Sequence, residues 1–162
     1  MAKSKGSSGS SSTASAYPPV SFRFKVTVAS TSGSSSEAYF KEVKGIGATM
    51  AVEEIREGGM IDTVYNMPGL VSYDNLVLTR GLAPKSSDII SWCIDTMSGK
   101  DNRIVKKQVV VALLNADQTS FMEWTFADAF PVKWSISDFN AMESDIAIET
   151  IEFKFSKMSI TK

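Results

Sequence analysis

The sequence predicts a mainly β protein: a two-sheet β barrel or sandwich with one flanking α-helix. Three observations lead to this fold class. The chain has 162 residues, which is enough for one domain with a sizeable core and too few for two ordinary domains. Several stretches alternate apolar and polar residues with the period of a β-strand. Only one stretch repeats its apolar residues with the period of a helix.

The first 16 residues are mostly Ser, Gly, Ala and Thr. Such a segment cannot bury enough apolar surface to offset the entropy of ordering, so we expect residues 1–16 to be a flexible tail and residues 17–162 to form the domain. The tail lacks the apolar run of a secretory signal, which predicts a protein that assembles in the cytoplasm. A second Ser-rich stretch, residues 30–36, is expected to be a loop.

The first half of the domain contains three predicted strands. Residues 21–28 alternate strictly between apolar and polar side chains, which indicates a half-buried strand. Weaker alternation predicts strands at about 38–44 and 49–57. We expect these two strands to pair as a hairpin around Gly45–Gly47.

The stretch MPGLVSYDNLVLTRGL covers Met67 to Leu82. It is predicted to open with a turn at Pro68–Gly69 and to continue as a strand over residues 73–80. Leu76 and Leu78 share one face of that strand, and Gly81 is expected to end it.

A helix is predicted over about residues 86–98. Its apolar stripe consists of Ile89, Ile90, Cys93, Ile94 and Met97. A serine precedes the stripe as a candidate N-cap, and Gly99 follows it as a candidate C-terminal stop.

The second half is predicted to be strands again. Residues 108–114 are apolar on both faces, which is typical of a central strand. A turn at 115–117 and strands at 121–126 and 132–136 follow. In the last strand the apolar phase shifts near Glu149–Thr150, which predicts a bulge or a change of strand neighbour there.

The composition excludes much enzymology. Histidine is absent and Cys93 is the only cysteine. These counts remove the usual general base, an internal disulfide and a thiolate zinc cluster. The net charge of −1 does not indicate specific nucleic-acid binding through a basic patch. We therefore expect no catalytic residue, no metal and no cofactor.

Three other interpretations of individual side chains stay open. Arg80 has the chemistry to bind a phosphate or carboxylate, although a strand-end arginine more often forms an ion pair. Pairs of glutamates have the chemistry of an acid/base pair in a hydrolase, but their spacing is not specific: Glu53, Glu54 and Glu57, and Glu149 with Glu152. Three tryptophans (Trp92, Trp124 and Trp134) have the chemistry to stack on a sugar in a small β-sandwich ligand- or carbohydrate-binding module, although core packing and subunit contact account for them more simply.

The strand content is high for a chain of this size, and exposed strand edges must be covered or paired. Pairing with identical copies in a closed ring would remove the edges. The sequence thus favours a structural, self-assembling protein over an enzyme.

Four segments together resemble the inner-tube proteins of contractile injection systems. They are VEEIREGG at 52–59, the stretch at 67–82, VVVALLNADQTSFMEWTFADAFPVKWS at 109–135 and FNAMESDIAIETIEF at 139–153. The family includes the tail-tube proteins of contractile-tailed phages and the tubes of phage-like extracellular injection particles. The resemblance covers about residues 20–156 in the family's order.

This resemblance implies a subunit that oligomerises into a hexameric ring with one continuous barrel, and rings that stack into a hollow tube inside a sheath. It implies sheath, baseplate or spike, and tube-terminating proteins as partners, a cargo effector in the lumen, and a target membrane that the assembly penetrates. Release of the particle and tethering in the producing cell are both left open. The residues expected at subunit or ring-stacking contacts are Glu53, Glu54, Arg56, Glu57, Met67, Pro68, Tyr73, Arg80, Trp134 and Glu149.

Overall fold

The computed structural model of the chain describes residues 23–29, 35–55, 64–83, 87–99, 103–138 and 146–161. In these residues it has ten strands and one helix. Their bounds are β1 Arg23–Ala29, β2 Ser35–Phe40, β3 Glu42–Lys44, β4 Thr49–Ile55, β5 Tyr65–Ser72, β6 Leu76–Gly81, α1 Asp88–Ser98, β7 Lys107–Leu114, β8 Ser120–Ile136, β9 Ile148–Lys154 and β10 Lys157–Ile160.

Eight of the strands form a barrel. The order of hydrogen-bonded neighbours is β2-β1-β7-β8-β9-β6-β3, with β10 on β8, and every pairing is antiparallel. Strands β2 and β3 are separated only by Lys41, whose backbone N–H donates to the carbonyl oxygen of Thr79. Because β2 pairs with β1 and β3 pairs with β6, the continuous β2–β3 segment connects the two ends of the strand order and closes the barrel. The predicted two-sheet β barrel is confirmed.

The long strand β8 bends and takes part in both sheets of the barrel. Its first half pairs with β7 and β10, and its second half pairs with β9. Its pairing register with β7 shifts between Lys107 and Val109, close to Asp128, whose φ of 54° lies in the left-handed region. A bulge of this kind bends a strand and increases its twist. One strand therefore serves both sheets, where the sequence predicted separate strands at 121–126 and 132–136.

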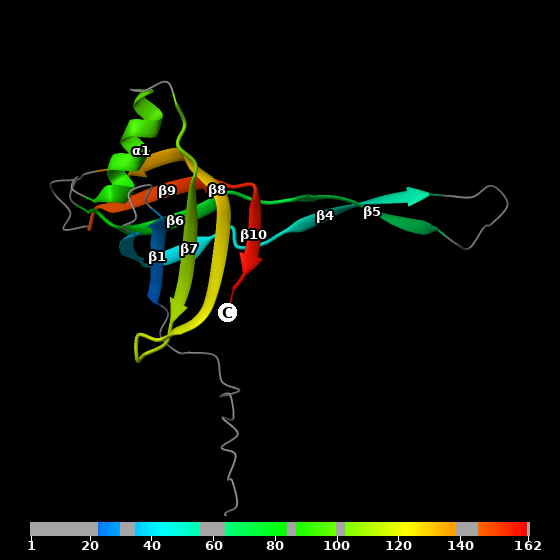
Figure 1. Cartoon of the computed structure of the whole chain (residues 1–162), viewed down its shortest axis with the longest axis horizontal. Coiled ribbons are helices and arrows are strands. Elements are labelled where there is room, and N and C mark those ends of the chain that lie inside the picture. Colours follow the sequence, from blue (N-terminus) through cyan, green and yellow to red (C-terminus); the bar gives the residue numbers. More distant parts are fainter. Residues whose placement is uncertain are drawn as a thin grey trace, which may run out of the picture.

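The helix α1 covers one opening of the barrel (Figure 1). Ser87 is its N-cap by backbone position, without a side-chain capping bond, and Gly99 ends it with a φ of 62°. Ile89 and Cys93 from the predicted stripe join the core, as does Trp92, whereas Met97 is exposed. The core otherwise consists of the inward side chains of the barrel: Val26, Val28, Ala38, Phe40, Leu76, Leu78, Val109, Val111, Phe126, Ala129, Ile151, Phe153 and Phe155.

Strands β4 and β5 pair only with each other and form a hairpin that projects away from the barrel (Figure 1). The predicted pairing of 38–44 with 49–57 is therefore wrong, since β3 pairs with β6 and β4 with β5. The predicted turn at Pro68–Gly69 is also wrong, because both residues lie inside β5. Proline is tolerated in this strand because a two-stranded ribbon consists of edge strands alone.

Gly45 lies where the chain leaves β3 for the hairpin. Its φ is 82°, and a Cβ atom built on it would fall on the carbonyl oxygen of Asn75. Only glycine fits this position, because any side chain would meet both the unfavourable φ and the neighbouring backbone. Gly47, two residues later, has open space around it.

The shift in the alternation of apolar residues along the last strand has a different cause from the one predicted. The register of β9 against β6 and β8 is continuous through Glu149 and Thr150, so no bulge lies there. Instead Glu149 points inward on the same face as Ile151, while Ile146 and Ile148 are exposed. The register shift in this pair lies on β8, between Pro131 and Lys133.

Two predictions concern the Ser-rich segments. Ser35 and Ser36 begin β2, so the expected loop at 30–36 is shorter than predicted at its C-terminal end. Residues 30–34 and the predicted tail at 1–16 lie outside the described residues.

Candidate functional site

The hairpin β4–β5 has almost no buried surface. Every residue of β4 is exposed, and so is every residue of β5 except Gly69. Its large exposed apolar side chains are Met50, Val52, Ile55, Tyr65, Met67, Leu70 and Val71. So many exposed large apolar side chains on one hairpin indicate an interaction site.

The pairing register gives the hairpin two distinct faces. Glu53 is opposite Met67 and Ile55 is opposite Tyr65, so these four side chains share one face. Glu54 is opposite Asn66, next to the Val52–Pro68 pair, on the other face. We call the first set, Glu53, Ile55, Tyr65 and Met67, the Glu53 face.

Within the described residues β2 and β3, at the two ends of the strand order, have one strand partner each, and two further strand edges of the barrel are open. Strand β10 pairs only with β8, which leaves its outer edge open. The second half of β8, beyond Ala129, pairs only with β9. Open edges carry unpaired N–H and C=O groups, and these groups can form hydrogen bonds with another chain.

A buried polar cluster lies under the helix. Arg80 Nε donates to Glu149 Oε2 at 2.8 Å, and Trp134 Nε1 donates to Glu149 Oε1 at 2.7 Å. The side chain of Arg80 is 9% exposed and that of Glu149 is fully buried. The guanidinium also lies 4.9 Å from the centre of the Phe40 ring and donates to the hydroxyl of Ser87 at 3.4 Å.

The cluster links four elements of the scaffold. Arg80 and Glu149 are opposite each other in the β6–β9 register, Trp134 comes from β8, and Ser87 is the N-cap of α1. Both charges are satisfied inside the subunit, so Arg80 is not open to bind a phosphate. Glu149 points into the core while Glu152 is on the opposite face of β9, 21% exposed and bound to Lys133. These two carboxylates do not face a common space, which removes the basis for a hydrolase at this pair.

The tryptophans are part of the packing. Trp92 is 5% exposed, stacks on Phe153 with ring centres 5.3 Å apart, and donates its Nε1–H to the carbonyl oxygen of Val105. Trp124 and Trp134 are partly buried against the core. A sugar-stacking platform built from all three side chains is therefore not formed.

Two pKa shifts follow from these environments. Burial, and next the nearby charge of Glu149, raises the pKa of the Cys93 thiol to about 12. A thiol with such a pKa is a poor nucleophile at neutral pH. The hydrogen bond from Lys133 lowers the pKa of Glu152, and a hydrogen bond from Asn75 adds to this effect.

Within the described residues no group of three or more metal-ligating side chains comes together, and no helix is long and apolar enough to cross a membrane.

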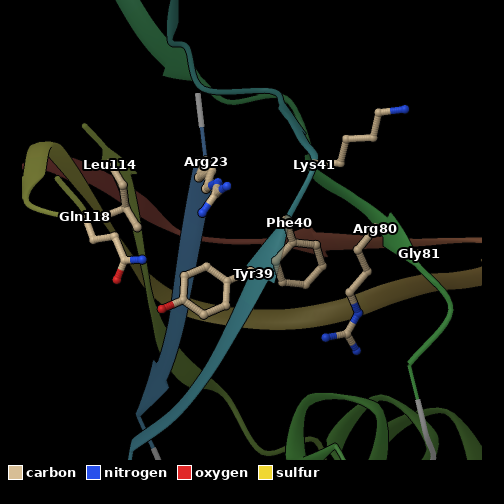
Figure 2. Close-up of a pocket in the computed structure, with 8 residues that line it drawn as sticks. All are labelled: Arg23, Tyr39, Phe40, Lys41, Arg80, Gly81, Leu114 and Gln118. Carbon is tan, nitrogen blue, oxygen red and sulfur yellow. The ribbon is translucent and has the colours of Figure 1, made fainter. Parts of the chain in front are cut away.

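A concave surface lies beside the Phe40 end of β2, with a volume of about 540 Å³. It is lined by Arg23, Tyr39, Phe40, Lys41, Arg80, Gly81, Leu114 and Gln118, and we call it the Arg23 groove. Figure 2 shows Arg23, Tyr39 and Gln118 gathered at one end, with Arg80 turned toward the helix and Lys41 directed away on the opposite side of Phe40.

The predicted contact residues fall into two separate groups. Glu53, Glu54, Met67 and Pro68 lie on the exposed hairpin, and Arg80, Trp134 and Glu149 form the buried cluster. Tyr73 is partly buried and packs on Phe155 with ring centres 5.3 Å apart. Arg56 and Glu57 lie outside the described residues.

The sequence reasoning missed the Arg23 groove. Arg23 was visible as one of the polar positions of an alternating strand, but nothing in the sequence indicated that β2 and the 115–118 turn lie beside it.

Comparisons with known proteins agree with this geometry. The family model of the T4-like virus tail tube protein gp19 matches residues 20–159. A chain of the anti-feeding prophage baseplate is 26% identical with a TM-score of 0.78, over 90% of this chain and 97% of that one. A chain of the sheath-tube complex of an extracellular contractile injection system, PVC, in the extended state is 26% identical with a TM-score of 0.75, over 96% of this chain and 99% of that one.

The fold is also shared with an Hcp protein, at 12% identity and a TM-score of 0.57, over 84% of this chain and 90% of that one. No curated protein matched the chain.

Proposed function

The chain belongs to the T4-like virus tail tube protein family, and on that premise we propose that it is the structural subunit of the inner tube of a contractile injection system. The family match over residues 20–159, which is nearly the whole folded domain, carries this proposal. The 26% identity to a chain of a sheath-tube complex, over 99% of that chain, supports it.

Lateral assembly would use the open strand edges. The outer edge of β10 and the free half of β8 are two different patches of one subunit, and both present unpaired backbone groups. A contact between two different patches is heterologous, so it closes into a ring when the rotation per subunit divides the circle. We propose a hexameric ring in which neighbouring sheets join into one continuous barrel.

Axial assembly would use the hairpin. An extended strand rises about 3.3 Å per residue, so the seven residues of β4 reach roughly 20 Å beyond the barrel. The exposed apolar side chains of this arm lose contact with water only if another subunit covers them. We propose that the hairpin, including Glu53, Glu54, Met67 and Pro68, contacts the next ring of the stack.

The proposed role is mechanical and needs no catalytic residue, metal or cofactor. Rings stack into a rigid hollow tube, which contraction of a surrounding sheath drives through a target membrane. Sheath, baseplate or spike, and tube-terminating proteins are the proposed partners, and a cargo effector is the proposed content of the lumen. The subunits assemble in the cytoplasm, and the finished particle acts from there or after release.

Negative-stain electron microscopy of the purified full-length chain tests the proposal, with sedimentation in parallel. The expected result is six-fold rings and stacked tubes at high protein concentration, or on addition of sheath protein or a baseplate seed. A chain that sediments as a monomer under all of these conditions would overturn the proposal.

A further inference from the structure

The hairpin and the Arg23 groove carry opposite charges that are both unpaired within the described residues. We propose that Glu53 on the hairpin of one copy binds Arg23 in the groove of a second copy. This inference rests on the proposed function, and it adds the acceptor surface and the ion pair that the tube contact would use.

The groove side has an available cation. Arg23 is exposed, and its side chain has no ion pair or hydrogen bond within the described residues. Its neighbours differ in this respect. Lys25, two residues along the same face of β1, binds Glu37 at 3.1 Å, and Arg80 at the other end of the groove is held by Glu149.

Neutral donors and an apolar wall complete the groove. Tyr39 is 59% exposed, and the side chains of Tyr39 and Gln118 approach the same end of the groove as Arg23 (Figure 2). Leu114 lies beside them. Arginine binds carboxylates through two parallel N–H donors, and a tyrosine hydroxyl or a glutamine amide adds a third.

Gln118 is held in place by the hairpin loop between β7 and β8. The backbone N–H of Gln118 donates to the carbonyl oxygen of Asn115, and the N–H of Asn115 donates to that of Thr119. The φ of Gln118, 60°, is the left-handed conformation usual at the end of such a loop.

The hairpin side has a matching anion. Glu53 is exposed and has no ion pair within the described residues, and its carboxylate is on the face shared with Met67, Ile55 and Tyr65. One negative charge among three apolar side chains complements the end of the groove where Arg23 lies beside a tyrosine ring and a leucine, with Lys41 directed away on the opposite side of Phe40. Glu54 carries the same charge on the opposite face, so it does not reach the groove when Glu53 does.

The two surfaces of one chain do not meet. The hairpin runs away from the barrel along its length, whereas Arg23 begins a barrel strand (Figure 1). The ion pair therefore requires two copies, and the repetition of subunits along a tube would form it many times.

Charge reversal with a matched control tests the proposal. Glu53→Lys is compared with Glu54→Lys, which makes the same charge change one residue away on the opposite face. We expect Glu53→Lys to raise the protein concentration needed for tube formation at least about tenfold, because losing one desolvated charge pair typically costs that much or more. Glu54→Lys changes the other face of the same hairpin contact, so its own effect on assembly is not the readout; combined with Arg23→Glu it should show no recovery, because Glu54 does not meet Arg23.

The reverse change on the groove completes the design. Arg23→Glu should impair tube formation as Glu53→Lys does, and the double variant Arg23→Glu/Glu53→Lys should recover most of the loss. Lys25→Gln, which removes a neighbouring cation that is already paired, is the control for the groove. Near-UV and far-UV circular dichroism of each variant verifies that the barrel is folded.

Cross-linking gives a second readout. One batch of chains carries Glu53→Cys, a second batch carries Arg23→Cys, and the two are mixed, assembled and treated with a bismaleimide. Native Cys93 is buried and should not react. Cross-linked dimers are expected in the mixture, and their absence from assembled tubes contradicts the pair.

The outcomes of the charge reversals distinguish failure of the pair from failure of the proposed function. If wild type forms no rings or tubes, the proposed function fails. If wild type forms tubes and Glu53→Lys forms them equally well, the function stands and the Glu53–Arg23 pair is wrong. The pair is also wrong if the double variant is no better than the single ones.

Discussion

Removing Arg80 should destabilise the subunit more than any surface substitution. In Arg80→Ala, Glu149 stays fully buried and keeps only the hydrogen bond from Trp134. Breaking a buried ion pair by deleting one partner costs about 3–5 kcal/mol. For a domain of this size each kcal/mol lowers Tm by about 2–4 °C, so the expected drop in Tm is roughly 6–20 °C.

A double-mutant cycle separates the ion pair from simple loss of packing. Arg80→Met/Glu149→Leu removes both charges and keeps apolar volume, and replacing a buried pair in this way is often nearly neutral. The double variant loses the acceptor of Trp134, which costs about 1–3 kcal/mol. We therefore expect it to be more stable than Arg80→Met or Glu149→Leu alone.

Urea denaturation at protein concentrations too low for assembly measures these differences. The reasoning would be refuted if the free energy of unfolding of Arg80→Ala lay within about 1 kcal/mol of the wild-type value, which is the contribution typical of an exposed ion pair. It would also be refuted if the effects of the two single substitutions simply added up in the double variant. We also expect Arg80→Ala to form fewer rings in sedimentation experiments, because the cluster fixes β6, β8 and β9 relative to each other.

Three further predictions follow from single positions. Gly45→Ala should lower the free energy of unfolding measured with urea by about 1–3 kcal/mol, since a strained φ costs that much, and it should also abolish tube formation. Gly47→Ala, at a position with open space around it, should have neither effect. Equal effects of the two substitutions would contradict this prediction. Cys93, whose pKa burial raises to about 12, should react with a thiol reagent at pH 8 only after unfolding, and fast labelling of the native protein would count against the packing. Because Lys133 lowers the folded pKa of Glu152, the pair should stabilise the protein above the unfolded pKa of about 4.5 and lose that contribution as the pH falls toward the folded value. Lys133→Met should reduce this dependence, which is worth at most about 1 kcal/mol for a partly exposed pair, and leave the smaller effect of Asn75. An unchanged pH profile would contradict the prediction.

Local patterns in the sequence were sufficient for most elements. Strict alternation identified β1, continuous apolar character identified β7, and the helical period with Gly99 at its end identified α1. Each signal is short-range, because the side chains that define it lie on one face of one element. In these elements the residues that are buried in the structure match the apolar pattern of the sequence.

The failures have a common physical cause in long-range pairing. Glycines at 45 and 47 looked like the tip of a hairpin, but they lie at the root of one, where Gly45 makes room for the backbone at Asn75. The Pro68–Gly69 pair looked like a turn because the sequence does not show that β5 has only one strand neighbour. The shift of apolar phase at Glu149 looked like a bulge because a buried glutamate is improbable until its partner Arg80 is known.

The candidate site, like the fold, could be predicted from the sequence only in part. The glutamates of the hairpin were identified from a family resemblance, and nothing in their spacing separates Glu53 from Glu54. The distinction needs the register of β4 against β5, which includes an irregularity between Met50 and Val52. Likewise the Arg23 groove exists only because β1, β2 and β7 are neighbours.

A cryo-EM reconstruction of tubes assembled from the purified chain is the most direct measurement of the proposed role. The account predicts stacked six-fold rings in which β10 and the free half of β8 are hydrogen-bonded to adjacent subunits and the hairpin is covered by another copy. Density that leaves these strand edges and the hairpin in solvent, or a protein that yields only isolated monomers with and without a baseplate seed, would contradict it.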